Sequence, residues 1–120
     1  MPQITVEYSA QLAGRFDRRA FALALHAEAS ALIDSTLGSF KTRFYRLDEV
    51  VIGAGAETDV MVHVDLAILP GRSRETKQKL GQTALDLLVR HLGDPGGLST
   101  QATVEVRELE GADYHKHVLV

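Results

Sequence analysis

The sequence contains no cysteine. Disulfide bonds, thiolate nucleophiles and cysteine-ligated metal sites are therefore excluded. Long hydrophobic runs are also missing, because nowhere do about eighteen apolar residues follow one another, and the N-terminus lacks the basic and apolar segments of a signal peptide. We expect a soluble, cytoplasmic protein that does not associate with a membrane.

The chain also lacks a strong charge of either sign. Its 13 lysines and arginines nearly balance 16 aspartates and glutamates, which leaves a formal net charge of -3. No basic surface of the kind that draws a protein onto nucleic acid is expected. A length of 120 residues suits one domain with a modest core.

The first half of the chain has the periodicity of a strand, a helix and a second strand. Residues 2–8 alternate between apolar and polar, as in a half-buried strand. From residue 17 to about 34 the apolar residues are spaced by three or four, which predicts an amphipathic helix. Residues 39–47 alternate again and predict a strand that continues toward Val51.

The second half repeats this order. Residues 58–69 give the strongest strand signal, because every second residue from Val60 to Ile68 is β-branched or aliphatic. Ser73 is expected to cap a helix that stops at Gly93, and residues 101–110 predict a last strand. The sequence thus predicts two βαβ units, over about 2–53 and about 58–110, followed by a tail over 111–120.

A duplicated βαβ pattern of this length predicts an α/β two-layer sandwich (an α+β arrangement) in a single domain over 1–120. Right-handed crossovers would place both helices on one face of a four-stranded sheet. The other face would carry mixed residues, such as Met61 with His63 and Lys41 with Tyr45. We expect this uncovered face to meet another subunit.

Pro2 follows the initiator methionine and begins the first strand. Proline is tolerated at the first position of a strand, where no ladder hydrogen bond is required of its nitrogen. If Met1 is removed, however, Pro2 carries a free secondary amine that could act as a base. The position alone does not distinguish the two interpretations.

Three cationic residues are candidates for binding an anion. Arg72 lies in the Pro70–Ser73 segment, where a strand ends and a helix begins, and its planar fork suits a carboxylate or phosphate. Lys41 and Arg43 share one face of a strand. The alternative is that all three side chains are simply solvated. For Arg72, the segment would then be only the capped start of a helix.

The histidines give weaker signals. His63 lies in mid-strand on the face without helices, where a structural or interface role is more common than catalysis. His115 and His117 have strand-like spacing for two metal ligands, but a third ligand is missing, so no metal site is predicted.

Pro2, the doubled βαβ pattern, Val62-His63 and the Gly71-Arg72-Ser73 turn leading into Glu75-Thr76-Lys77-Gln78 resemble the 5-carboxymethyl-2-hydroxymuconate isomerase family of the tautomerase superfamily. The similarity extends from Pro2 to about the end of the second helix and weakens after Gly93. Pro2 together with the Gly-Arg-Ser turn is the specific part of the resemblance.

This resemblance implies a homotrimer whose sheets pack around a central axis, and an isomerase of aromatic catabolism that needs no cofactor. It implies that the Pro2 amine is the catalytic base and that Arg72 binds a carboxylate of a small carboxylated enol. The second family arginine aligns with Lys41, and Arg43 matches a neighbouring arginine. Lysine keeps the charge of an arginine but loses its bidentate fork.

Other activities remain compatible with the sequence. Within the superfamily these are a phenylpyruvate-type tautomerase and a dehalogenase. A non-catalytic oligomeric domain that binds a carboxylate metabolite would need Arg72 and Lys41 but not Pro2. Because small second residues generally permit methionine removal, we predict that Met1 is removed in the cell.

Overall fold

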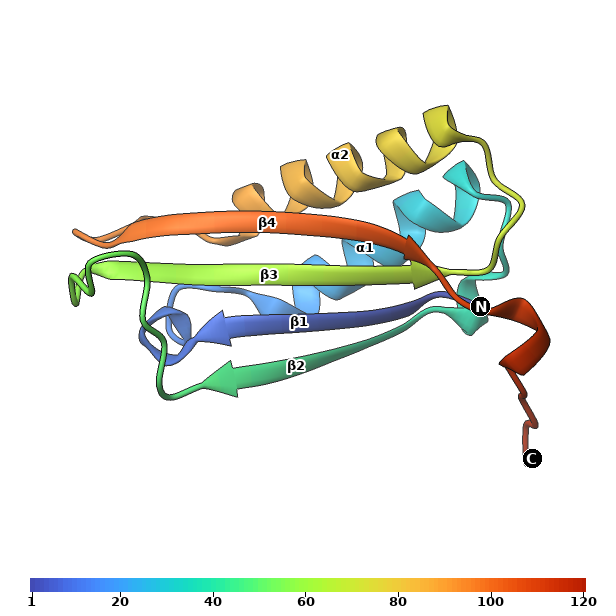
Figure 1. Cartoon of the computed structure of the whole chain (residues 1–120), viewed down its shortest axis with the longest axis horizontal. Coiled ribbons are helices and arrows are strands. Elements are labelled where there is room, and N and C mark those ends of the chain that lie inside the picture. Colours follow the sequence, from blue (N-terminus) through green and yellow to red (C-terminus); the bar gives the residue numbers. More distant parts are fainter.

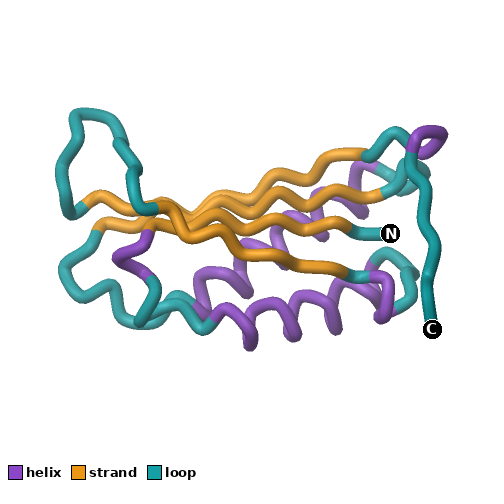
Figure 2. Tube along the Cα trace, turned by 90° about the horizontal axis from the view of Figure 1, so that it is seen from below, coloured by secondary structure: helices purple, strands orange, loops and turns teal.

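The computed structural model describes residues 1–120 and shows one mixed sheet with two helices on one face (Figures 1 and 2). The strands run in the order β2-β1-β3-β4, with β1 parallel to β2, β3 parallel to β4 and the central pair β1 and β3 antiparallel. The elements are β1 (Gln3–Ser9), α1 (Arg18–Leu32), β2 (Lys41–Leu47), β3 (Asp59–Ile68), α2 (Arg74–His91) and β4 (Ser99–Glu108). The predicted duplicated βαβ sandwich is confirmed.

The core lies between the sheet and the helices, because alternation along the central strands turns one set of side chains toward α1 and α2. On β1 the buried residues are Ile4, Val6 and Tyr8. The buried β3 residues include every second position from Val60 to Ile68. The helical residues that complete the core are Phe21, Leu25 and Ala29 of α1, and Leu80, Ala84, Leu87 and Leu88 of α2.

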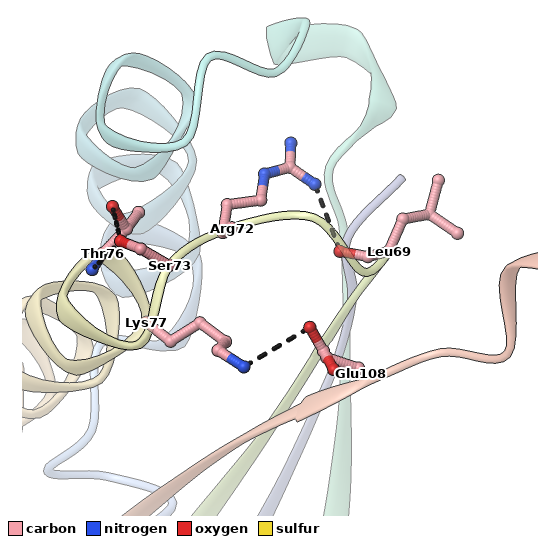
Figure 3. Close-up of polar contacts among 6 residues, drawn as sticks. All are labelled: Leu69, Arg72, Ser73, Thr76, Lys77 and Glu108. Carbon is pink, nitrogen blue, oxygen red and sulfur yellow. Dashed lines mark hydrogen bonds and ion pairs between the residues drawn. The ribbon is translucent and has the colours of Figure 1, made fainter.

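Both helices begin at a side-chain cap. Asp17 Oδ1 accepts a hydrogen bond from the Ala20 amide over 3.2 Å, and the predicted cap Ser73 Oγ accepts one from the Thr76 amide over 3.1 Å (Figure 3). These bonds satisfy amides that have no partner inside the helix. The start of α2, and with it the preceding loop, is therefore fixed in place.

Two strand boundaries differ from the sequence prediction. Strand β2 ends at Leu47 and does not continue toward Val51. Leu47 pairs with Ser9, the last residue of β1, so beyond it β2 has no neighbouring backbone to bond. Strand β4 covers 99–108 instead of 101–110, since it pairs residue for residue with the ten residues of β3.

The face without helices is polar. Arg107 Nε donates to both carboxylate oxygens of Asp65, over 2.9 and 3.0 Å, and His63 Nδ1 lies 2.7 Å from Thr103 Oγ1. His63 thus has the hydrogen-bonded role that the sequence favoured. Neither helix combines the length and the apolar character that a bilayer span requires.

Candidate active site

Pro2 lies at the beginning of β1, at the end of the sheet where the loop before α2 and the C-terminal tail also meet (Figure 1). Its side chain is buried, and its carbonyl oxygen accepts a hydrogen bond from the Lys41 amide over 3.3 Å. The backbone of Pro2 is therefore held by β2, while β3 lies on the other side of β1. A group at this position points in a fixed direction.

Arg72 is placed by the loop between β3 and α2. Gly71, directly before it, has φ of 122°, a conformation that glycine adopts without the strain of a side chain. The Arg72 guanidinium donates a hydrogen bond to the carbonyl oxygen of Leu69 over 3.3 Å (Figure 3). It donates another to the carbonyl oxygen of Ile33 over 3.0 Å. The side chain is half-buried and anchored, unlike the solvated arginine considered as the alternative, and three of its five N–H donors remain available.

Lys41 and Arg43 begin β2, beside β1. Lys41 Nζ donates to the Ser39 carbonyl oxygen over 2.9 Å, and Lys41 pairs with Gln3 in the parallel register. Arg43 Nη2 donates to Gln3 Oε1. Both cations are exposed, so their charges are accessible to a ligand.

The chain start is the point on which these charges converge. In the structure the free amine is that of Met1, and its pKa lies below the ordinary value, first because the amine is partly buried and then because Arg72, Lys41 and Lys116 repel its proton. Arg72 and Lys41, both candidates from the sequence, thus act on the same amine. Arg43 is not among the charges that lower the pKa, and it contacts Gln3 instead.

Lys116 was not foreseen from the sequence. It lies in the tail, with Nζ 3.8 Å from the Met1 sulfur, and Tyr114 of the same tail accepts a hydrogen bond from Gln3 Nε2 over 2.8 Å. The only sequence signal in 111–120 is that cationic and aromatic residues lie close together there. The contacts themselves join residues more than a hundred positions apart in the chain.

The largest hollow in the subunit lies elsewhere. It measures about 550 Å³ and lies between α1 and β2, where Phe16, Arg18 and Phe44 line it. His26, also in its wall, has a ring nitrogen 2.7 Å from Thr42 Oγ1. No hollow is lined by Pro2, Arg72 or Lys41, so a single subunit does not enclose a pocket around these residues.

The remaining histidines form no metal site. His115 and His117 are exposed, and no three histidine, aspartate or glutamate side chains lie close enough together to hold a metal ion. His91 Nδ1 lies 2.7 Å from the Leu87 carbonyl oxygen within α2, and its ring lies edge-on to Phe21. It is a structural residue of the helix layer.

The arrangement at the chain start suits proton transfer to and from an anion. An amine with a lowered pKa is neutral at a lower pH than usual and can then accept a proton. Cations nearby can hold carboxylates and stabilise negative charge as it develops. A duplicated βαβ sandwich with a partly buried chain start and nearby cations has the features expected of the tautomerase superfamily.

The comparisons with known proteins are more specific. The model of the 5-carboxymethyl-2-hydroxymuconate isomerase family matches residues 2–118. The chain belongs to this family and is an enzyme of the isomerase class. No curated protein sequence matches the chain.

Solved structures support the same assignment. A 5-carboxymethyl-2-hydroxymuconate isomerase from Deinococcus radiodurans R1 superposes with a TM-score of 0.86 at 26% identity, over 97% of this chain and 88% of that one. A 5-carboxymethyl-2-hydroxymuconate delta-isomerase gives a TM-score of 0.85 at 16% identity, over 98% and 89% of the two chains. A fused 4-OT described as a symmetric trimer gives 0.69 at 21% identity, over 92% and 88%, and shares the fold.

Proposed function

We propose that the protein ketonises a carboxylated 2-hydroxymuconate-type dienol, such as 5-carboxymethyl-2-hydroxymuconate, in aromatic catabolism, with the Pro2 amine as general base. The observation that carries this proposal is that the charges of Arg72 and Lys41 both act on the partly buried amine at the chain start. The family membership supports the reaction class. The cytoplasmic location and the lack of affinity for nucleic acid stay predictions from the sequence.

The proposed base requires that Met1 be removed. While Met1 is present, the Pro2 nitrogen is an amide without useful basicity. After removal, the free amine lies one residue further along the chain, about 3.8 Å from the former position measured between Cα atoms. Arg72 and Lys41 would continue to disfavour the ammonium form of this amine and so lower its pKa.

The chemical step is a transfer of one proton with no change of oxidation state. The neutral amine takes the proton of the enol hydroxyl. The electrons of the O–H bond then form the C=O bond of the ketone, and the diene electrons shift along the conjugated system. The ammonium then gives a proton to a carbon of the diene. Arg72 and Lys41 would hold the substrate carboxylates and stabilise the dienolate between the two transfers, with Arg43 further along the same strand.

Oligomerisation belongs to the same proposal. The sheet face without helices carries the half-buried Met61 and His63 beside paired charges, and a single subunit encloses no pocket around the candidate residues. We infer a homotrimer in which neighbouring subunits cover this face and wall the site. Native mass spectrometry should show three copies of the 13.1 kDa chain, and a monomer at micromolar concentration would contradict this.

The function is tested by following ketonisation of 5-carboxymethyl-2-hydroxymuconate by ultraviolet absorbance, with wild type and Pro2→Ala. We expect acceleration by the wild type and a loss of about a hundredfold in kcat/KM in the variant, within the range of general base catalysis. Equal accelerated rates in both would contradict Pro2 as the base, and a wild type without acceleration would leave a carboxylate-binding domain as the better description. Phenylenolpyruvate and 3-chloroacrylate should react more slowly; a preference for either would replace the proposed substrate.

A further inference from the structure

The C-terminal tail returns to the start of the chain. After β4 the Leu109 amide donates to the Ile68 carbonyl oxygen over 2.7 Å, and a short 3-10 turn, Gly111–Asp113, redirects the backbone. The tail then crosses the end of the sheet close to the N-terminus (Figure 2). Residues from opposite ends of the sequence thus lie side by side at the candidate active site.

A hydrogen-bonded tether holds the tail in this position. Gln3 Nε2 donates to the half-buried Tyr114 hydroxyl over 2.8 Å, and Gln3 Oε1 accepts from Arg43 Nη2. The Gln3 amide therefore connects the tail to β2 through both of its polar atoms. Gln3 is also the residue directly after Pro2, so the tether is built on the same backbone as the proposed base.

The tether brings a further cation to the site. Two residues beyond Tyr114, the exposed Lys116 lies with Nζ 3.8 Å from the Met1 sulfur. Its charge acts on the Met1 amine together with those of Arg72 and Lys41, and after removal of Met1 the Gln3–Tyr114 hydrogen bond still holds the tail beside the new chain start. The site then has one cation from each of three separate segments: the loop before α2, the start of β2 and the tail.

We propose that Lys116 binds a third carboxylate of the substrate, and that Tyr114 and Gln3 are the positioning residues that hold Lys116 and Arg43 in place. The inference rests on the proposed function and makes it more specific. Arg72 and Lys41 account for two carboxylates, whereas 5-carboxymethyl-2-hydroxymuconate carries three. The tail therefore selects a tricarboxylate over an otherwise similar dicarboxylate.

A binding measurement tests this without any turnover. Isothermal titration calorimetry compares propane-1,2,3-tricarboxylate with glutarate, which lacks the central carboxylate, in wild type, Lys116→Met and Lys79→Met. Lys79 is the matched control, an exposed lysine on α2 paired with Glu75 over 3.7 Å. We expect Lys116→Met to reduce the preference for the tricarboxylate about threefold to fivefold, as for an accessible ion pair, and Lys79→Met to leave it unchanged. Equal preferences in the two variants would overturn the role of Lys116.

The tether is tested by Tyr114→Phe, which removes only the hydroxyl. The same preference should fall, and the pKa of the processed amine, followed by ¹⁵N NMR, should rise in both Lys116→Met and Tyr114→Phe because a positive charge has left or loosened. No change of either quantity in Tyr114→Phe would overturn the tether. The ketonisation assay distinguishes failure of the proposed function from failure of this inference. If the wild type does not ketonise the substrate but still prefers the tricarboxylate, the role of Lys116 stands and the proposed reaction does not.

Discussion

The Arg72 guanidinium donates a hydrogen bond over 3.0 Å to the carbonyl oxygen of Ile33, a residue that lies 39 positions earlier in the chain. Ile33 is the C-cap of α1, so Arg72 connects the end of one helix to the loop that begins the other. A further bond from Arg72 to Leu69 ties the same loop to the end of β3. The residue proposed to bind substrate is therefore also held by the fold.

Replacing Arg72 with lysine should weaken both stability and substrate binding. An ammonium group is too compact to reach both carbonyl oxygens and also face a carboxylate. We expect Arg72→Lys to lower the free energy of unfolding by about 1 kcal/mol and to raise KM more than it lowers kcat. Urea unfolding and steady-state kinetics measure these effects. The exposed neighbour Arg74 provides the control, and an Arg72→Lys protein indistinguishable from Arg74→Lys would contradict the assigned contacts.

The lowered pKa of the chain-terminal amine predicts a pH dependence of catalysis. The neutral amine is the active form, so kcat/KM should rise as the pH increases through the pKa of the processed amine and then level off. Lys41→Met removes one of the charges that lower this pKa, so the rising limb should move to higher pH. Profiles of wild type, Lys41→Met and the control Lys79→Met test this. A limb that moves to lower pH, or moves equally in both variants, would be inconsistent with the site.

His26 should make the protein less stable in acid. Burial lowers its pKa in the folded state, and its ring nitrogen lies 2.7 Å from Thr42 Oγ1. Because the unfolded chain binds this proton more tightly, the stabilisation is complete above the unfolded pKa of about 6.5 and is lost as the pH falls through the folded pKa. We expect His26→Gln to unfold in guanidinium with a smaller dependence on pH.

Unfolding midpoints at pH 7.5 and pH 5.0 provide the measurement for His26. The exposed His117 of the C-terminal tail gives the control. If the unfolding midpoint changes between pH 7.5 and pH 5.0 by the same amount in His26→Gln and in His117→Gln, His26 does not contribute to the acid sensitivity.

Much of the fold could be predicted from the sequence because its periodicity follows directly from burial. The alternation of Ile4, Val6 and Tyr8 follows from local strand geometry, because a shift by one residue would turn these side chains away from the core. The cap at Ser73 likewise follows from the local geometry of the helix start. The end of β2 at Leu47 could not be predicted this way. It depends on where β1 stops, which is a property of the neighbouring strand.

The candidate site was predictable only in part for a related reason. Pro2, Arg72 and Lys41 lie at element boundaries, where a strand begins or a loop turns into a helix, and such boundaries can be recognised locally. Tyr114 and Lys116 lie in a tail without periodicity, and their contacts with Gln3 and Met1 arise only when the two chain ends meet. The hydrogen bond from Arg72 to the Ile33 carbonyl oxygen, 39 positions away in the chain, could not be recognised locally either.

The central claim is that the free amine of Pro2 is the base, and its most direct test leaves every side chain unchanged. The protein is prepared with an N-terminal extension joined directly to Pro2, whose removal by a specific protease leaves Pro2 as the first residue. We expect the extended form to show at most about one hundredth of the kcat/KM for 5-carboxymethyl-2-hydroxymuconate, and cleavage to restore full activity. Equal kcat/KM before and after cleavage, with the new N-terminus verified by mass, would contradict the account.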